Sequence, residues 1–393
     1  MAASSRVPVE VWWKIFQDVF SLEGLFATTY NGDDWPQTAA KLRYTYTSDF
    51  KAAEEQRKVL RSVCKVWRRL ADSEGRRFVP VDLFGHAGSS AVTDRDSILT
   101  TWGLYCASVD ILSQDLSRVT AQWRVLRICQ ESAKGLEHVH HPHLRRLEMF
   151  LGRDDGVPYV PDDLVDALKS FTNITWVRYM TYTTGYRDVC LNDDEGERVT
   201  LPNLQVLYYY GTRSLHLPFY RLVLPSLRHL TIITRISAEI FPLRRIIAAY
   251  GETLHSLQIQ ASARSNGPPV PDDLFPLDDP GYFPHWNYVP HLRNLWIGES
   301  MILKYHLIPS NHPLRVFTAQ MSEMDDLCSW IELARNLKRV GMLLTVRDES
   351  NGGLVGAYNG LSILSCDDLK ALEAKVASRG IVLEVFKSSR NIA

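Results

Sequence analysis

The densest group of side chains able to do chemistry is a histidine cluster, with His138, His140, His141 and His143 inside six residues. Four imidazoles at this spacing could bind a transition metal if the backbone aimed them at one point. Pro142 and the strand expected after it favour a solvated turn instead. The sequence has no G-x-S-x-G elbow, no phosphate-binding P-loop and no G-x-G-x-x-G loop. We therefore expect no metal, no cofactor and no catalytic residue, with an unrecognised enzyme as a remaining alternative.

Composition restricts the class of partner. The 393 residues carry a net charge of −1, which gives no general reason to expect nucleic acid or a membrane surface as partner. The six cysteines are scattered without metal-ligand spacing, which indicates neither a zinc site nor a disulfide framework. Glu10 and Asp18 interrupt any signal-peptide core, and no run reaches about 18 apolar residues. These features predict a cytoplasmic or nuclear protein.

Two amphipathic stretches near the amino terminus, residues 7–16 and 59–71, are the most informative elements. Pro8 is expected to be the first residue of a helix, where its missing N–H costs nothing. The second stretch lies in a continuous helix pattern over 49–70, with Leu60, Val63, Cys64 and Trp67 on one face and mostly basic residues opposite.

The pair of stretches resembles an F-box. The matching positions are Val7, Pro8, Glu10, Ile15, Phe16, Val63, Cys64, Lys65 and Trp67. Val7 stands where the family usually has Leu, and residues about 21–56 form a long insertion between the two halves. The resemblance implies a three-helix module that docks on the Skp adaptor of a cullin–RING ubiquitin ligase. The implied adaptor-binding residues are Val7, Pro8, Glu10, Val11, Ile15, Phe16, Val63, Cys64, Trp67 and Leu70.

Two alternatives to adaptor docking remain open. These apolar residues could form the core of an ordinary helical cap on the next domain. The chain could also be a non-ligase scaffold whose degenerate F-box no longer engages the adaptor. If the module does dock on the adaptor, the remainder of the chain is expected to capture a protein substrate.

From about Trp123 a unit of the form apolar-x-x-apolar-x-apolar recurs, often just after a proline. Successive units are 22 to 38 residues apart, which overlaps the period of leucine-rich repeats, with longer steps where loops intrude. Each unit predicts one short strand that must stack on its neighbours to bury its apolar face. The units begin at Leu144, Ile174, Leu204, Leu227, Leu254, Leu292, Leu314 and Leu337.

The predicted fold class is α/β. It comprises a small three-helix F-box module with an internal insertion over 1–85, a linker or first irregular repeat over 86–122, and an irregular leucine-rich-repeat solenoid with a parallel sheet over 123–393. One or two short helices are expected within 98–116, and a helix from Asp367 to Ser378 with a strand from Ile381 to Phe386 as a terminal cap. A doubly wound α/β domain is the alternative, since strand–helix alternation looks similar.

Strand alternation predicts a substrate-binding surface. The two later apolar residues of each unit point inward, so the residues between them face outward. Large aromatic rings on such a face indicate a binding surface for a protein segment. The expected substrate-binding residues are Trp176, Arg178, Tyr208, Tyr210 and Trp296. The alternative is that these rings are ordinary core.

Overall fold

The structure, a computed structural model, is mixed α/β with a long parallel sheet and few helices. It describes residues 7–19, 46–73, 78–80, 103–106, 123–130, 142–152, 168–182, 198–211, 221–234, 243–260, 286–297, 309, 311–319, 336–345 and 366–388. The α/β class with a parallel sheet, as predicted, is confirmed at this level. None of the helices in these ranges is long and apolar enough to cross a membrane.

The chain divides into two compact units, which are described separately. The first comprises Met1–Arg153, Tyr159–Thr181 and Val199–Gln205. The second comprises Asp154–Pro158, Tyr182–Arg198 and Val206–Ala393.

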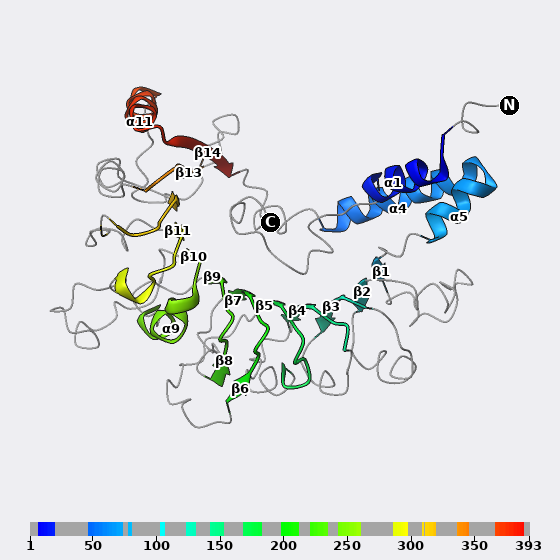
Figure 1. Ribbon diagram of the computed structural model, residues 1–393, viewed down its shortest axis with the longest axis horizontal. Helices are drawn as coiled ribbons and strands as arrows, with labels where there is room; N and C mark the ends of the chain where they lie inside the picture. Colours follow the sequence, from blue (N-terminus) through cyan, green and yellow to red (C-terminus); the bar gives the residue numbers. More distant parts are fainter. Residues whose placement is uncertain are drawn as a thin grey trace, which may run out of the picture. The chain divides into compact units, whose positions relative to one another are not determined.

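Three helices of the first unit lie together near the amino terminus (Figure 1). They are α1 (Val9–Val19), α4 (Tyr46–Val63) and α5 (Lys65–Ser73). Helix α1 begins one residue after Pro8, whose carbonyl oxygen accepts the N–H groups of Val11 and Trp12. The predicted continuous helix over 49–70 is wrong, because the helix breaks at Cys64 and restarts as α5.

The strands of the first unit are β1 (Phe78–Pro80), β2 (Gly103–Cys106), β3 (Val125–Gln130), β4 (Arg146–Gly152), β5 (Trp176–Tyr182) and β6 (Val199–Thr200). The order β1-β2-β3-β4-β5 follows the chain, and β1 to β4 pair in parallel. Strand β2 lies where short helices were expected within 98–116, and over 103–106 that prediction is wrong. Gly103-Leu-Tyr-Cys106 is too short to show a period, and its ladder to β1 and β3 decides its conformation.

The second unit holds β7 (Val206–Gly211), β8 (Leu222–Val223), β9 (His229–Thr234), β10 (Ser256–Gln260), β11 (Asn294–Ile297), β12 (Val316–Ala319), β13 (Arg339–Thr345) and β14 (Val382–Ser388). Its helices are α9 (Leu243–Tyr250), the short 3-10 turns η6 (Gly251–Thr253) and η8 (Trp286–Tyr288), and α11 (Cys366–Ser378). Strands β7, β9, β10, β11, β12, β13 and β14 are parallel neighbours in that order (Figure 1).

All eight recurring sequence units form strands, and their inner residues form the core. Leu147, Leu230 and Leu257 are each no more than 1% exposed. One hydrogen-bond pattern recurs before β4, β5, β10, β11, β12 and β13: the N–H of the residue before the strand and the N–H of the strand's first residue both donate to the carbonyl of the residue that precedes the neighbouring strand. At the carboxyl end, α11 ends at Ser378, and Gly380 just after it has a φ of 68°, a conformation that glycine adopts without steric cost. The predicted terminal helix and strand are confirmed.

Candidate functional site

The three amino-terminal helices share a small aromatic core. Phe16 of α1 and Ala71 of α5 are fully buried, and Trp12, Leu60, Trp67 and Leu70 pack around them. The Trp67 ring lies 4.7 Å from the Trp12 ring and 5.5 Å, edge to face, from the Phe16 ring, measured between centroids. Because such tilted aromatic pairs add to the burial energy, Trp67 holds α1 against α5.

Polar groups fix the junction between α4 and α5. The backbone N–H of Trp67 donates to the Cys64 sulfur at 3.4 Å, so Cys64 caps the start of α5. The buried guanidinium of Arg57 donates to the carbonyl oxygen of Ala71. Arg61 and Asp72 form an ion pair of 2.9 Å between the two helices. The Val-Cys-x-x-Trp spacing thus has a local structural reason, namely a cap followed by a core residue.

Helix α1 carries a second apolar stripe on a different face from its core residues. Val11 and Ile15 of α1 are 46% and 41% exposed, and Val7, two residues before the helix begins, continues their four-residue spacing and is 36% exposed. One position further along, Phe16 is buried and Trp12 is partly buried in the core of the module. A surface helix normally turns polar residues outward, so α1 exposes an apolar face that its own module does not cover. Val59, Val63 and Val66 on α4 and α5 are also exposed.

The predicted adaptor-binding residues therefore fall into two groups. Phe16 is buried, and Trp67 and Leu70 are half-buried, all within the module's own core. The remaining residues are exposed: Val7, Pro8, Glu10, Val11, Ile15, Val63 and Cys64. Trp67, which was expected to fill a partner's groove, is half-buried and packs against Trp12 and Phe16 within the module.

The predicted substrate-binding strand face is buried in the first unit. Trp176 is 1% exposed and Arg178 is 5% exposed. The Trp176 ring lies 4.2 Å beneath the Arg146 guanidinium, a cation–π arrangement. Arg127 aligns with Glu148 on the neighbouring strand, and the hydrogen bonds from Thr175 and Trp176 to Arg145 align Arg178 with Glu148 on the other side.

Glu148 is the centre of a buried charge cluster on this face. Its carboxylate forms an ion pair with Arg146, and its second oxygen lies 3.9 Å from Arg127. Burial alone would raise the pKa of Glu148, but the guanidinium groups of Arg146, Arg178 and Arg127 outweigh burial and lower that pKa to about 2. Three arginines around one carboxylate leave a local excess of positive charge, and the cluster fixes the packing of β3, β4 and β5.

On the corresponding face of the second unit, mostly polar side chains at aligned positions of neighbouring strands form rows across the sheet, and most of them are buried. Tyr208, Thr231, Gln258 and Trp296 follow one another across four strands, and Tyr208 is 5% exposed while Trp296 is half-buried. The Thr231 hydroxyl donates to Gln258 at 3.4 Å. In the next row, the Asn294 amide donates to the Ser256 hydroxyl at 2.9 Å.

The sequence-based expectation that these rings form an open surface is corrected for Trp176 and Tyr208. Their burial agrees with the alternative that they are core residues. The physical reason is that parallel sheets are generally covered on both faces, so alternation identifies two faces but not which of them meets water. Tyr210 and Trp296, both half-buried, are the accessible members of the predicted set.

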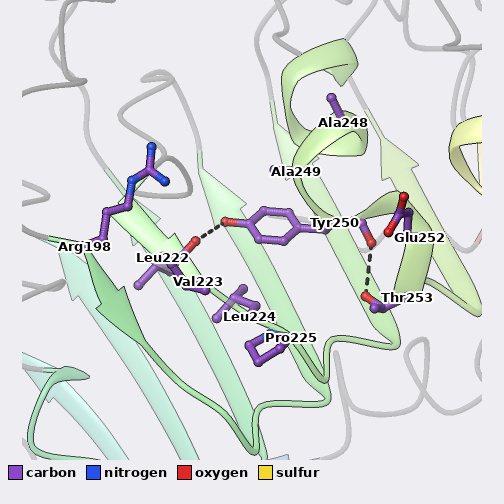
Figure 2. Close-up of a pocket in the computed structure, with 10 residues that line it drawn as sticks. All are labelled: Arg198, Leu222, Val223, Leu224, Pro225, Ala248, Ala249, Tyr250, Glu252 and Thr253. Carbon is purple, nitrogen blue, oxygen red and sulfur yellow. Dashed lines mark hydrogen bonds between the residues drawn. The ribbon is translucent and has the colours of Figure 1, made fainter.

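A pocket of about 420 Å³ lies in the second unit between β8 and the end of α9 (Figure 2). Leu222, Leu224, Pro225 and Ala249 form its apolar lining. The Tyr250 hydroxyl donates to the Leu222 carbonyl at 2.8 Å, so that polar group is already engaged within the protein. Arg198 and Glu252 lie on opposite sides of the Tyr250 ring in this view. No sequence motif pointed to this pocket, because its lining comes from segments without a shared pattern.

No group of three or more potential metal ligands occurs within the described ranges. His143 is exposed there, while His138, His140 and His141 lie outside the described residues. The buried His229 has its pKa lowered to about 3 by burial and by the nearby His255 and Arg228, so it is neutral at physiological pH.

Comparison with known proteins gives little further guidance. No protein-family model matches the chain. No curated protein matches it either. Among solved structures, it is similar to a Bacteroides fragilis protein determined by structural genomics, with 15% identity and a TM-score of 0.37 over 64% of this chain. The match spans 66% of that chain, slightly under two-thirds.

Proposed function

We propose that this chain is a substrate receptor, in which helices α1, α4 and α5 form an F-box-like module that binds an Skp-family adaptor of a cullin–RING ubiquitin ligase. The observation that carries the proposal is the exposed apolar stripe formed by Val11 and Ile15 of α1 and by Val7 just before it, while Trp12 and Phe16, on another face of the helix, pack within the module. An apolar stripe of this kind is what a helix-binding groove recognises. The proposal assigns the module a binding role and no catalysis.

We propose further that the parallel strands form an irregular leucine-rich-repeat solenoid that offers a substrate surface. In each unit the strands follow one another in chain order, and all strand pairings given above are parallel. A doubly wound domain would reverse its strand order at a switch point, and the described strands of the long sheet show no such reversal. The repeated turn hydrogen bonds also support one stacked structural unit per repeat.

The test of adaptor binding is a titration of the purified full chain with an Skp-family adaptor. Val11→Asp/Ile15→Asp is the disrupting variant, and Val382→Asp is the matched control because Val382 is an exposed valine in the second unit. Burying the exposed part of both α1 side chains is worth about 1–3 kcal/mol, so their loss should weaken binding roughly ten- to a hundredfold.

Circular dichroism establishes that the variant remains helical. Adaptor binding that is equal in both variants would contradict the α1 interface. No adaptor binding by the unaltered chain would favour the scaffold alternative over the ligase receptor.

A further inference from the structure

Five neighbouring strands of the second unit, β9 to β13, are each preceded by a basic residue. These residues are Arg228, His255, Arg293, Arg315 and Lys338, which precede β9, β10, β11, β12 and β13. We call this set the basic row.

Backbone hydrogen bonds place the basic row in one line. The N–H of His255 donates to the Arg228 carbonyl, and that of Arg293 donates to the His255 carbonyl, both at 2.8 Å. Arg315 and Lys338 continue the same chain of bonds, again at 2.8 Å each. Neighbouring strands of a sheet are about 4.8 Å apart, so the five residues span about 19 Å along one edge. The line is therefore fixed by the main chain and does not depend on side-chain rotamers.

The four cations of the row are accessible and are not neutralised within the described structure. Arg228, Arg293, Arg315 and Lys338 are all exposed, and none forms an ion pair with another described residue. His255 is half-buried, and its ring stacks on that of His291 at 6.3 Å. The pKa of His255 is lowered, chiefly by burial, so the row carries its charge on four side chains.

In the first unit the run of basic residues is interrupted. Arg124 and Arg145 precede β3 and β4, but Thr175 precedes β5 and Gln205 precedes β7. Arg145 donates to the carbonyl oxygens of Pro142, Leu144 and Asn173. Arg145 is thus engaged with its own turn. The uninterrupted run of basic side chains belongs to the second unit.

We propose that the basic row binds an acidic peptide segment with closely spaced Asp or Glu side chains. Like charges held in a line repel one another, and an anionic partner relieves that repulsion. An extended peptide advances about 3.4 Å per residue, so about six residues laid along the edge match the row. The chain as a whole has a net charge of −1, which favours a local contact with a peptide over a nucleic-acid surface. This inference deepens the proposed receptor role, because it names the chemistry of the substrate segment.

The test uses the full chain and a labelled peptide of about ten residues that alternates Glu and Ser. In extended form this peptide is longer than the basic row. A peptide with Gln in place of Glu is the uncharged control. Fluorescence anisotropy measures binding at about 0.1 M and about 1 M salt, between which the Debye length falls from about 10 to about 3 Å. We expect the Glu peptide alone to bind, and binding to weaken strongly at the higher salt.

Charge variants locate the site. Arg293→Glu should weaken binding about three- to twentyfold, because it removes one attraction and adds one repulsion. Arg293→Lys should bind nearly as the unaltered chain does. The matched control is Arg379→Glu, which makes the same charge change at an exposed arginine of the second unit outside the row. Arg293→Glu/Arg315→Glu should weaken binding further than either change alone.

Three results would overturn the proposal: no binding of the Glu peptide, equal losses in Arg293→Glu and Arg379→Glu, or tighter binding of a single-stranded oligonucleotide of similar length. The adaptor variant Val11→Asp/Ile15→Asp should bind the peptide normally, since it alters the helical module alone. Failure of adaptor docking and failure of the basic row are therefore separate outcomes.

Discussion

Replacing Glu148 by Gln should destabilise the first unit by an amount that depends on pH. The ionised carboxylate lies against the guanidinium groups of Arg146, Arg178 and Arg127, which lower its pKa from 4.5 to about 2. Glutamine has nearly the same shape as a protonated glutamic acid but cannot ionise. The Glu148→Gln variant therefore reports what the charge contributes in the folded state.

The magnitude follows from the pKa difference of about 2.5 between 4.5 and 2. At about 1.4 kcal/mol per pKa unit, the carboxylate contributes about 3–4 kcal/mol to the free energy of unfolding. Because the folded-state pKa is the lower one, this contribution is fully present above about pH 4.5 and is lost as the pH falls toward 2. The variant leaves three arginines beside a neutral amide. The expected loss in free energy of unfolding agrees with the usual cost of breaking a buried ion pair, about 3–5 kcal/mol.

Urea unfolding followed by tryptophan fluorescence, at pH values from about 3 to about 7, measures the difference between the two proteins. Other groups, including the buried His229, titrate equally in both and cancel in that difference. We expect the variant to be less stable at pH 7 by about 3–4 kcal/mol, with the gap closing below about pH 4.5. A gap that stays constant down to pH 3 would refute the assignment of Glu148 as an ionised centre of the cluster.

Three further changes test the packing of the helical module and the second unit. Trp67→Ala should lower the free energy of unfolding of the amino-terminal module by about 3 kcal/mol, measured by urea denaturation and limited proteolysis, while Trp67→Phe should retain most of it because a ring remains against Trp12 and Phe16. Cys64→Ser should leave helix content unchanged, since serine keeps a capping acceptor for α5, whereas Cys64→Ala should lower the free energy of unfolding by about 1 kcal/mol. Equal stability of the two variants would argue against the cap. Gly251→Ala should cost about 1–3 kcal/mol in thermal unfolding, because the added Cβ would overlap the backbone carbonyl oxygen of Tyr288.

The strands were predictable from the sequence because each repeat contains the same short apolar pattern. All eight recurring units became strands, since two apolar residues separated by one position suffice to define the inner face. The break at Cys64 was not predictable from periodicity, because the apolar residues on both sides keep a helical spacing across it. A side-chain sulfur that caps α5 is a local contact that no apolar pattern records.

The exposure of a residue was harder to predict than its place on a strand or helix. Alternation correctly separated Leu147 and Met149 from Arg146 and Glu148, yet all four are at most 1% exposed. Periodicity gives direction from the backbone, whereas burial depends on what lies over each face. The same limit applies to Trp67, whose type and spacing suited either a partner's groove or the module's own core.

The basic row could have been found in the sequence by aligning the repeats position by position and comparing every column, not only the apolar ones. In the unit sequences Leu227-Arg228, Leu254-His255, Leu292-Arg293, Leu314-Arg315 and Leu337-Lys338, the basic residue always follows the first apolar position. A parallel sheet turns such a recurrence into a line, because equivalent positions of successive strands are neighbours in space. Charge that looks balanced over the whole chain, at a net −1, is therefore concentrated along one edge by the topology. A net charge near zero excludes a generally cationic protein, but it does not exclude a cationic binding edge.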